Sequence, residues 1–161
     1  METKWDLRFL ALAEHISRWS KDTTKVGAVI ADPFRRIISC GFNGYPVLVS
    51  DNDTDSNETK LEKVLHAEEN AILFAKQNVE SCTLYCTRLP CSRCAAHIIQ
   101  AGITCVIVPG PAPYVEETAI GWRKSVKTGL DMFEEAYVTV RCVGPNQRTW
   151  FLPWGLDYDE D

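Results

Sequence analysis

The segment 64-VLHAEENAILFA-75 decides how this chain is interpreted, together with the segment 89-LPCSRCAAHIIQAG-102. In both segments apolar residues recur at helical spacing after a short start, which predicts helices over residues 66–77 and 91–101. Pro90 directly precedes the second helix, a position at which its missing N–H costs nothing. His66 therefore opens one predicted helix, whereas Cys91 and Cys94 open the other.

The sequence on either side of these helices alternates between strand and helix patterns. Runs of β-branched residues predict a hairpin, in which strands at 25–31 and 36–41 flank the turn Asp-Pro-Phe-Arg. Further strands are expected at residues 82–86, 104–108 and 137–141, and further helices over residues 5–16 and 117–136. A hairpin followed by the order β-α-β-α-β implies an α/β fold, with a mixed sheet and helices on its faces.

Two segments do not fit this alternation. The polar and acidic segment 50-SDNDTDSNETKLEK-63 predicts a solvated loop, and it lacks the glycine of an EF-hand calcium loop. Residues 142–161 form a C-terminal extension, aromatic and then acidic, that we expect either to pack on a partner subunit or to add a covering strand. At 161 residues, the whole chain 1–161 is expected to be a single domain.

Composition excludes several classes of protein. The net charge of −5 and the pI of about 5.2 argue against a surface that grips long nucleic acid. No run of 18 apolar residues occurs, so no membrane span is expected. Charged residues interrupt the N-terminal segment, which predicts a cytoplasmic protein without a signal peptide. Seven cysteines, an odd number, do not suggest a disulfide framework in such a compartment.

His66, Cys91 and Cys94 are the first residues whose pattern indicates chemistry. One imidazole and two thiolates meeting at two helix N-termini would leave a fourth metal position open, as in catalytic zinc sites. Glu68 lies two residues beyond His66 and can then remove a proton from a zinc-bound water without ligating the metal. Glu69 is expected to face solvent. A purely structural zinc site would have no use for Glu68, which distinguishes an enzyme from a zinc-stabilised interaction module.

The remaining histidines and two further cysteines receive structural interpretations. His97 would close the metal site as a fourth ligand, so we interpret it as a packed or exposed helix residue. His15 has no nearby partner in the sequence and is expected at the surface or in an interface. Cys82 and Cys86 share one face of a predicted strand and are expected in the core.

The spacing H-x-E…P-C-x-x-C is typical of zinc nucleobase deaminases, and the chain resembles the cytidine deaminase superfamily, most closely its deoxycytidylate (dCMP) deaminase branch. The matching stretches cover most of residues 5–140: SKDTTKVGAVI, GFNGYP, HAEENAI, TLYCTRLPCSRCAAHIIQAGI and GWRKSVKTGLDMFEEAYV. The resemblance implies a three-layer α/β/α fold around a five-stranded mixed sheet, and a homo-oligomer, with a hexamer favoured. It assigns one Zn²⁺ per chain to His66, Cys91 and Cys94, the proton shuttle to Glu68, and substrate contacts to Asn43 and Ala67.

The resemblance also implies the reaction. Zinc-bound hydroxide attacks C4 of a cytosine deoxynucleotide, Glu68 protonates N3, and dCMP becomes dUMP plus ammonia in pyrimidine deoxynucleotide metabolism. The alternatives are a 5-substituted dCMP or dCTP as substrate, and a base in RNA or single-stranded DNA, which the acidic composition disfavours. Cations available for a 5′-phosphate are Lys25, Arg88, Arg93, Arg123 and Lys124.

The chain departs from the branch after GFNGYP. The branch continues with a basic residue and a glycine, where this chain has Val47 and Leu48. In the family this loop helps to hold nucleotide phosphates, so control by the effectors dCTP and dTTP is open here. Residues 45–65 contain no cysteine or histidine, which predicts a single zinc rather than a second, structural one.

Overall fold

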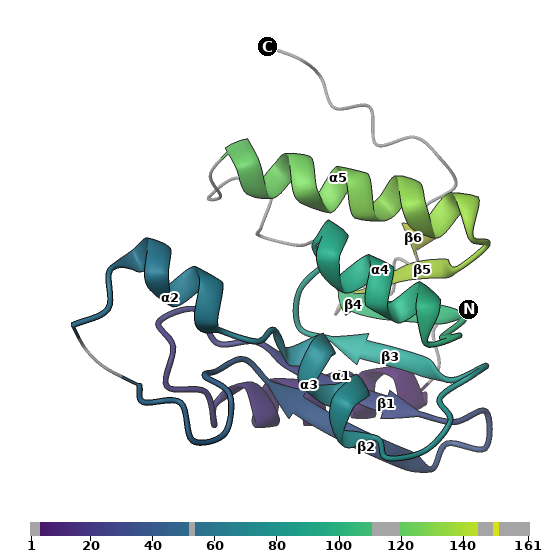
Figure 1. The fold of residues 1–161 in the computed structure, drawn as a ribbon. Helices are drawn as coiled ribbons and strands as arrows, with labels where there is room; N and C mark the ends of the chain where they lie inside the picture. Colours follow the sequence, from purple (N-terminus) through teal and green to yellow (C-terminus); the bar gives the residue numbers. More distant parts are fainter. Residues whose placement is uncertain (1–3, 52–53, 111–119, 145–149, 152–161) are drawn as a thin grey trace.

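A mixed six-stranded sheet with strand order β2-β1-β3-β4-β5-β6 forms the centre of the chain (Figure 1). The computed structural model describes residues 4–51, 54–110, 120–144 and 150–151. The strands are β1 (Gly27–Ala31), β2 (Ile37–Phe42), β3 (Thr83–Cys86), β4 (Cys105–Pro109), β5 (Thr139–Val143) and β6 (Trp150–Phe151). Strands β3, β4 and β5 are parallel, whereas β1 is antiparallel to both β2 and β3.

The five predicted strands and the mixed sheet are confirmed, and β6 adds a two-residue strand to them. It pairs antiparallel with β5, with Phe151 opposite Arg141. This pairing places part of the C-terminal extension at the edge of the sheet. Residues 145–149 and 152–161 of the extension lie outside the described residues, and so does the predicted start of the last helix at residues 117–119.

The helices are α1 (Lys4–Ser17), α2 (Asn57–Lys63), α3 (Ala67–Phe74), α4 (Ser92–Gln100) and α5 (Ile120–Glu135). Helix α2 corrects the prediction that residues 50–63 form only a loop. Its N-cap is Ser56, whose Oγ accepts a hydrogen bond from the Thr59 N–H at 3.2 Å. None of its residues is buried, so the segment has no apolar periodicity by which sequence patterns identify a helix.

Alternating side chains divide the sheet between two cores, which confirms the three-layer α/β/α architecture. Ile30, Leu84 and Val106 are fully buried on the face that α3, α4 and α5 cover. Tyr85 and Ile107 point to the opposite face, where they pack against α1. Helices α4 and α5 lie side by side over the parallel strands (Figure 1). The central strands are therefore buried on both faces, as parallel sheets require.

The seven cysteines, all within the described residues, form no disulfide with one another. Cys82 and Cys86 are buried in the core beneath α3 and α4, as the strand pattern predicted. His15 is exposed on α1, in agreement with a surface position.

Candidate metal centre and substrate cavity

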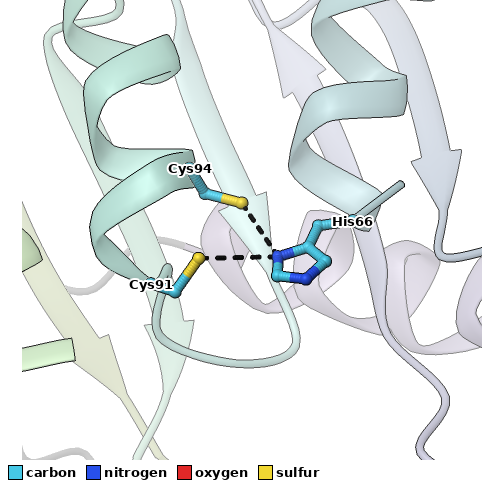
Figure 2. Close-up of side chains that lie close together, drawn as sticks. All are labelled: His66, Cys91 and Cys94. Carbon is cyan, nitrogen blue, oxygen red and sulfur yellow. Dashed lines mark hydrogen bonds between the residues drawn. The ribbon is translucent and has the colours of Figure 1, made fainter. Parts of the chain in front are cut away.

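His66, Cys91 and Cys94 come together at the N-termini of α3 and α4 (Figure 2). The Nδ1 atom of His66 lies 3.2 Å from the Cys94 sulfur and 3.5 Å from the Cys91 sulfur. Tetrahedral zinc with a Zn–N bond of about 2.0 Å and a Zn–S bond of about 2.3 Å sets ligand N···S separations of roughly 3.6 Å. The three ligand atoms therefore fit one zinc ion, with a fourth position left to a non-protein ligand.

The local fold explains why these three residues meet. His66 is the N-cap residue of α3 and Cys91 is the N-cap residue of α4, both with extended backbone geometry. Each helix thus presents its positive dipole end to the thiolates. Gly41 of β2 lets α3 come close to the sheet, because a Cβ atom at this position would lie 2.5 Å from the Ala67 carbonyl oxygen.

Helix α5 supports the loop that carries the cysteines. The Ser92 N–H at the start of α4 donates to the Ser125 Oγ at 3.1 Å, and the two hydroxyl oxygens are 2.9 Å apart. Gly129 allows close packing here, since a Cβ atom would lie 3.2 Å from the Pro90 carbonyl oxygen. The cysteine loop is therefore held between β3 and α5.

The two cysteine thiols have very different affinities for a proton. A hydrogen bond from the Cys94 thiol, with a further one from His66, lowers the pKa of Cys91 to about 3. The same hydrogen bond, together with burial, raises the pKa of Cys94. The hydrogen bond with Cys91 also raises the pKa of His66. The lowered pKa favours the thiolate form of Cys91, and a bound cation would replace the proton shared with Cys94.

A cavity of about 510 Å³ opens beside the three ligands, and His66, Ala67 and Glu68 line it. Glu68 is only 4 % exposed, and burial raises the pKa of its carboxyl group. A buried carboxyl group with a raised pKa can both accept and donate a proton near neutral pH. The cavity thus places a group suited to general acid–base chemistry beside His66 of the metal-binding trio.

Asn43 also lines the cavity, and its amide holds two neighbouring backbone groups. Its Nδ2 donates to the Thr24 carbonyl at 2.8 Å, and its Oδ1 accepts from the Val26 N–H at 2.9 Å. One amide hydrogen and one oxygen lone pair remain for another partner. Lys25 donates to the Ser20 carbonyl, and Arg123 is exposed on α5; neither is among the residues that line the cavity. Their phosphate-binding roles stay predictions.

Three residues of the cavity wall stand out beyond those that the sequence assigned to the substrate. Arg88 was only one of five available cations, whereas Lys60 and Trp122 were not identified. The Lys60 amine pairs with Asp22 at 3.2 Å, and the Trp122 ring centroid lies 6.3 Å from that of His66. Lys60 belongs to α2, the helix without apolar periodicity, so no sequence signal placed it here. Trp122 lies in the stretch GWRKSVKTGLDMFEEAYV, and its only sequence signal was the resemblance of this stretch to the family.

Glu69 does not face solvent, which corrects the prediction from the sequence. It is 6 % exposed, its Oε2 accepts from the His66 N–H at 2.8 Å, and it pairs with Arg93 at 2.8 Å. The spacing from His66 to Glu69 is that of a capping box, and this signal could have predicted its position. His97 is half exposed with its Nδ1 3.3 Å from Glu69, and it is not part of the metal-binding trio.

The fold and the site define an α/β/α protein with a three-ligand metal centre of the catalytic type. A model of the cytidine and deoxycytidylate deaminase zinc-binding region matches residues 3–109. The chain belongs to this family, which makes it a zinc-dependent deaminase. No helix in the described part of the chain has the length and apolarity needed to cross a membrane.

Individual relatives agree with this assignment. An uncharacterized deaminase in the luxG 3′ region of Aliivibrio fischeri is 49 % identical, over 87 % of this chain and 94 % of its own length. The human deoxycytidylate deaminase is 39 % identical, over 65 % of this chain and 64 % of its own length. The chain spans 58–64 % of the animal deoxycytidylate deaminases that it matches.

A solved structure also matches the fold. The dCMP deaminase from cyanophage S-TIM5, in complex with dCMP and dUMP, superimposes with a TM-score of 0.69 at 27 % identity. The match covers 87 % of this chain and 97 % of the cyanophage chain.

Proposed function

We propose that this protein hydrolyses dCMP to dUMP and ammonia. The observation that carries the proposal is that the buried Glu68 carboxyl group lines the same cavity as His66, the histidine of the metal-binding trio. The relatives named as deoxycytidylate deaminases, and the dCMP and dUMP bound in the cyanophage enzyme, support this substrate.

In this proposal each group at the site has one task. His66, Cys91 and Cys94 hold a single zinc ion, which when bound makes water a nucleophile at neutral pH. Glu68 would accept a proton from the attacking water and deliver it to N3 of the ring. It would then take the remaining proton from the hydroxyl group newly attached to C4 and give it to the leaving amine, so that ammonia departs and the C4 carbonyl forms. The raised pKa of Glu68, caused by burial, matches its carboxyl group to this exchange.

The cavity wall suggests how the nucleotide lies. Asn43 and Ala67 contact the sugar and the base edge, with the free hydrogen and lone pair of the Asn43 amide as the polar partners. Among the described cations that line the cavity, Lys60 already pairs with Asp22, whereas Arg88 has no ion-pair partner within the described residues. We therefore assign the 5′-phosphate to Arg88 in preference to Lys25 or Arg123. A single unpaired guanidinium favours a monophosphate over dCTP.

The wider setting follows from the same features. We propose a cytoplasmic location, since the free thiols at the centre need a reducing compartment. The single domain over residues 1–161, the hexamer and the absence of a second zinc stay predictions, and dCTP and dTTP are effectors to be tested. The alternative of a 5-substituted dCMP also stays a prediction. The acidic composition disfavours a base within a nucleic acid.

The test is an ammonia-release assay on dCMP, 5-methyl-dCMP, dCTP, deoxycytidine and CMP, with and without dCTP and dTTP, alongside metal analysis. We expect dCMP to be the best substrate, with one zinc per chain. Glu68→Gln should retain zinc and fold but lose turnover by a factor of about 100 or more, because the shuttle is removed. A zinc-loaded wild type that is inactive on dCMP would refute the substrate, and an active Glu68→Gln variant would refute the role of Glu68.

A further inference from the structure

The Glu69 carboxylate contacts both of the helices that carry the metal-binding residues. Its Oε2 accepts from the backbone N–H of His66 on the α3 side. The same oxygen accepts from the Arg93 guanidinium on α4, also at 2.8 Å. Its Oε1 lies 3.3 Å from the His97 Nδ1 one turn further along α4. One side chain therefore joins the two helix N-termini that Figure 2 shows on either side of the ligand cluster.

The positions of these partners relate the contact to the metal centre. Arg93 lies in the chain between Cys91 and Cys94, and His97 follows Cys94 by three residues. The His66 N–H belongs to the ligand residue itself. A shift of Glu69 would thus move the backbone of His66 relative to the helix that carries both sulfur ligands. The three ligand atoms lie within 4.8 Å of one another, and metal sites tolerate only about ±0.2 Å in bond length.

Capping of α3 alone does not explain the arrangement. A cap needs one oxygen on one N–H group, and glutamine serves this purpose as well as glutamate. The buried negative charge is used instead by Arg93, at a position where an unpaired carboxylate would be unfavourable. The ion pair therefore requires an explanation of its own.

We propose that Glu69 is a positioning residue, and that its ion pair with Arg93 fixes the separation of His66 from Cys91 and Cys94 and so strengthens zinc binding. The proposal rests on the assignment of these three residues as zinc ligands. It concerns the metal affinity of the site and does not depend on which nucleotide is deaminated.

The experiment compares zinc dissociation constants by competition with a chromophoric chelator. Glu69→Gln keeps the capping oxygen but removes the charge, and Arg93→Gln removes the other half of the ion pair. Each substitution should weaken zinc binding about tenfold or more, as substitutions of residues that orient metal ligands typically do. The double variant should resemble either single variant, because both remove the same contact. Arg93→Lys should recover part of the loss.

Asp55→Asn is the control, since Asp55 also pairs with a lysine at 2.9 Å and is partly buried, but is not part of the ligand cluster. It should leave the zinc affinity within about twofold of wild type. The melting temperature of each zinc-free protein separates general destabilisation from an effect on the metal. Unchanged zinc affinity in Glu69→Gln and Arg93→Gln, or additive losses in the double variant, would overturn the proposal. If Glu69→Gln does not fold, Arg93→Gln, altered at a half-exposed side chain, decides the question alone.

Discussion

Gly41 provides the sharpest test of how the fold positions the metal centre. In Gly41→Ala, the new methyl group would lie 2.5 Å from both the Ala67 carbonyl oxygen and the Ala71 nitrogen. This distance is 0.9 Å short of the 3.4 Å at which ordinary contact begins, and both neighbours are backbone atoms of α3. Helix α3 must therefore move away from β2 by a comparable amount. Such overpacking costs about 1–3 kcal/mol, and we expect the upper part of that range because neither neighbour is a flexible side chain.

The same displacement moves His66, which caps α3, several times further than the tolerance of about ±0.2 Å on a metal–ligand bond. We expect a melting temperature lower by about 4–12 °C, and weaker zinc binding in the chelator competition assay. Gly44→Ala is the control, because a Cβ atom there meets nothing within 4 Å. A Gly41→Ala protein with wild-type melting temperature and zinc affinity would refute the view that the close approach of α3 to β2 sets the position of His66.

Two further predictions concern the cavity and its outer wall. Arg88→Gln should raise the KM for dCMP about tenfold or more, because a hydrogen bond to a charged phosphate is worth about 1.5–3 kcal/mol. The KM for deoxycytidine, which has no phosphate, should stay within about twofold of wild type. Equal changes in KM for both substrates in steady-state assays would contradict the assignment of the phosphate to Arg88. A hydrogen bond from Lys63, which outweighs the opposing effect of burial, lowers the pKa of Asp55 from its usual 3.8. A lowered pKa means that the carboxylate stabilises the fold above the unfolded-state pKa and loses this effect as the pH falls through the folded-state value. In denaturant titrations of the zinc-free protein, Asp55→Asn should therefore be less stable than wild type at pH 7, and the difference should shrink as the pH falls below 4; a difference that grows instead would refute the ion pair.

The sequence predicted those parts of the fold in which burial leaves a periodic pattern. The hairpin, the parallel strands, and helices α3 and α4 all have apolar faces, and their order is confirmed. Helix α2 was missed because it buries no side chain, so its formation depends on its Ser56 cap and polar contacts rather than on an apolar stripe. A sequence shows the apolar periodicity of an element that packs against the core, but it does not show which charged side chains will form ion pairs.

The residues of the candidate site also divide into those that the sequence identified and those that it did not. His66, Cys91 and Cys94 could be identified because metal ligation restricts residue type and spacing, and the structure brings them together as one possible metal site. Glu69 was misplaced because residues next to one another on a helix usually face different ways. Here the side chain turns back to the backbone of His66, and Arg93 on another helix compensates its charge. The contribution of Lys60 to the cavity depends on long-range placement that no local pattern records.

The two walls of the cavity differ in how tightly they pack against the rest of the protein. Leu61 and Lys60 line the cavity from α2, a helix without a buried residue. The ion pair of Lys60 with Asp22 attaches this helix to the rest of the described chain, and so does the hydrogen bond from Tyr45 to Asp55 just before the helix. The opposite wall, at Ala67 and Glu68, belongs to the packed core. Segments with few buried contacts open locally at a much smaller free energy than the core does. Amide hydrogens of α2 should therefore exchange with solvent far sooner than those of α3, because this wall of the cavity can open locally while the helix that begins at His66 stays folded.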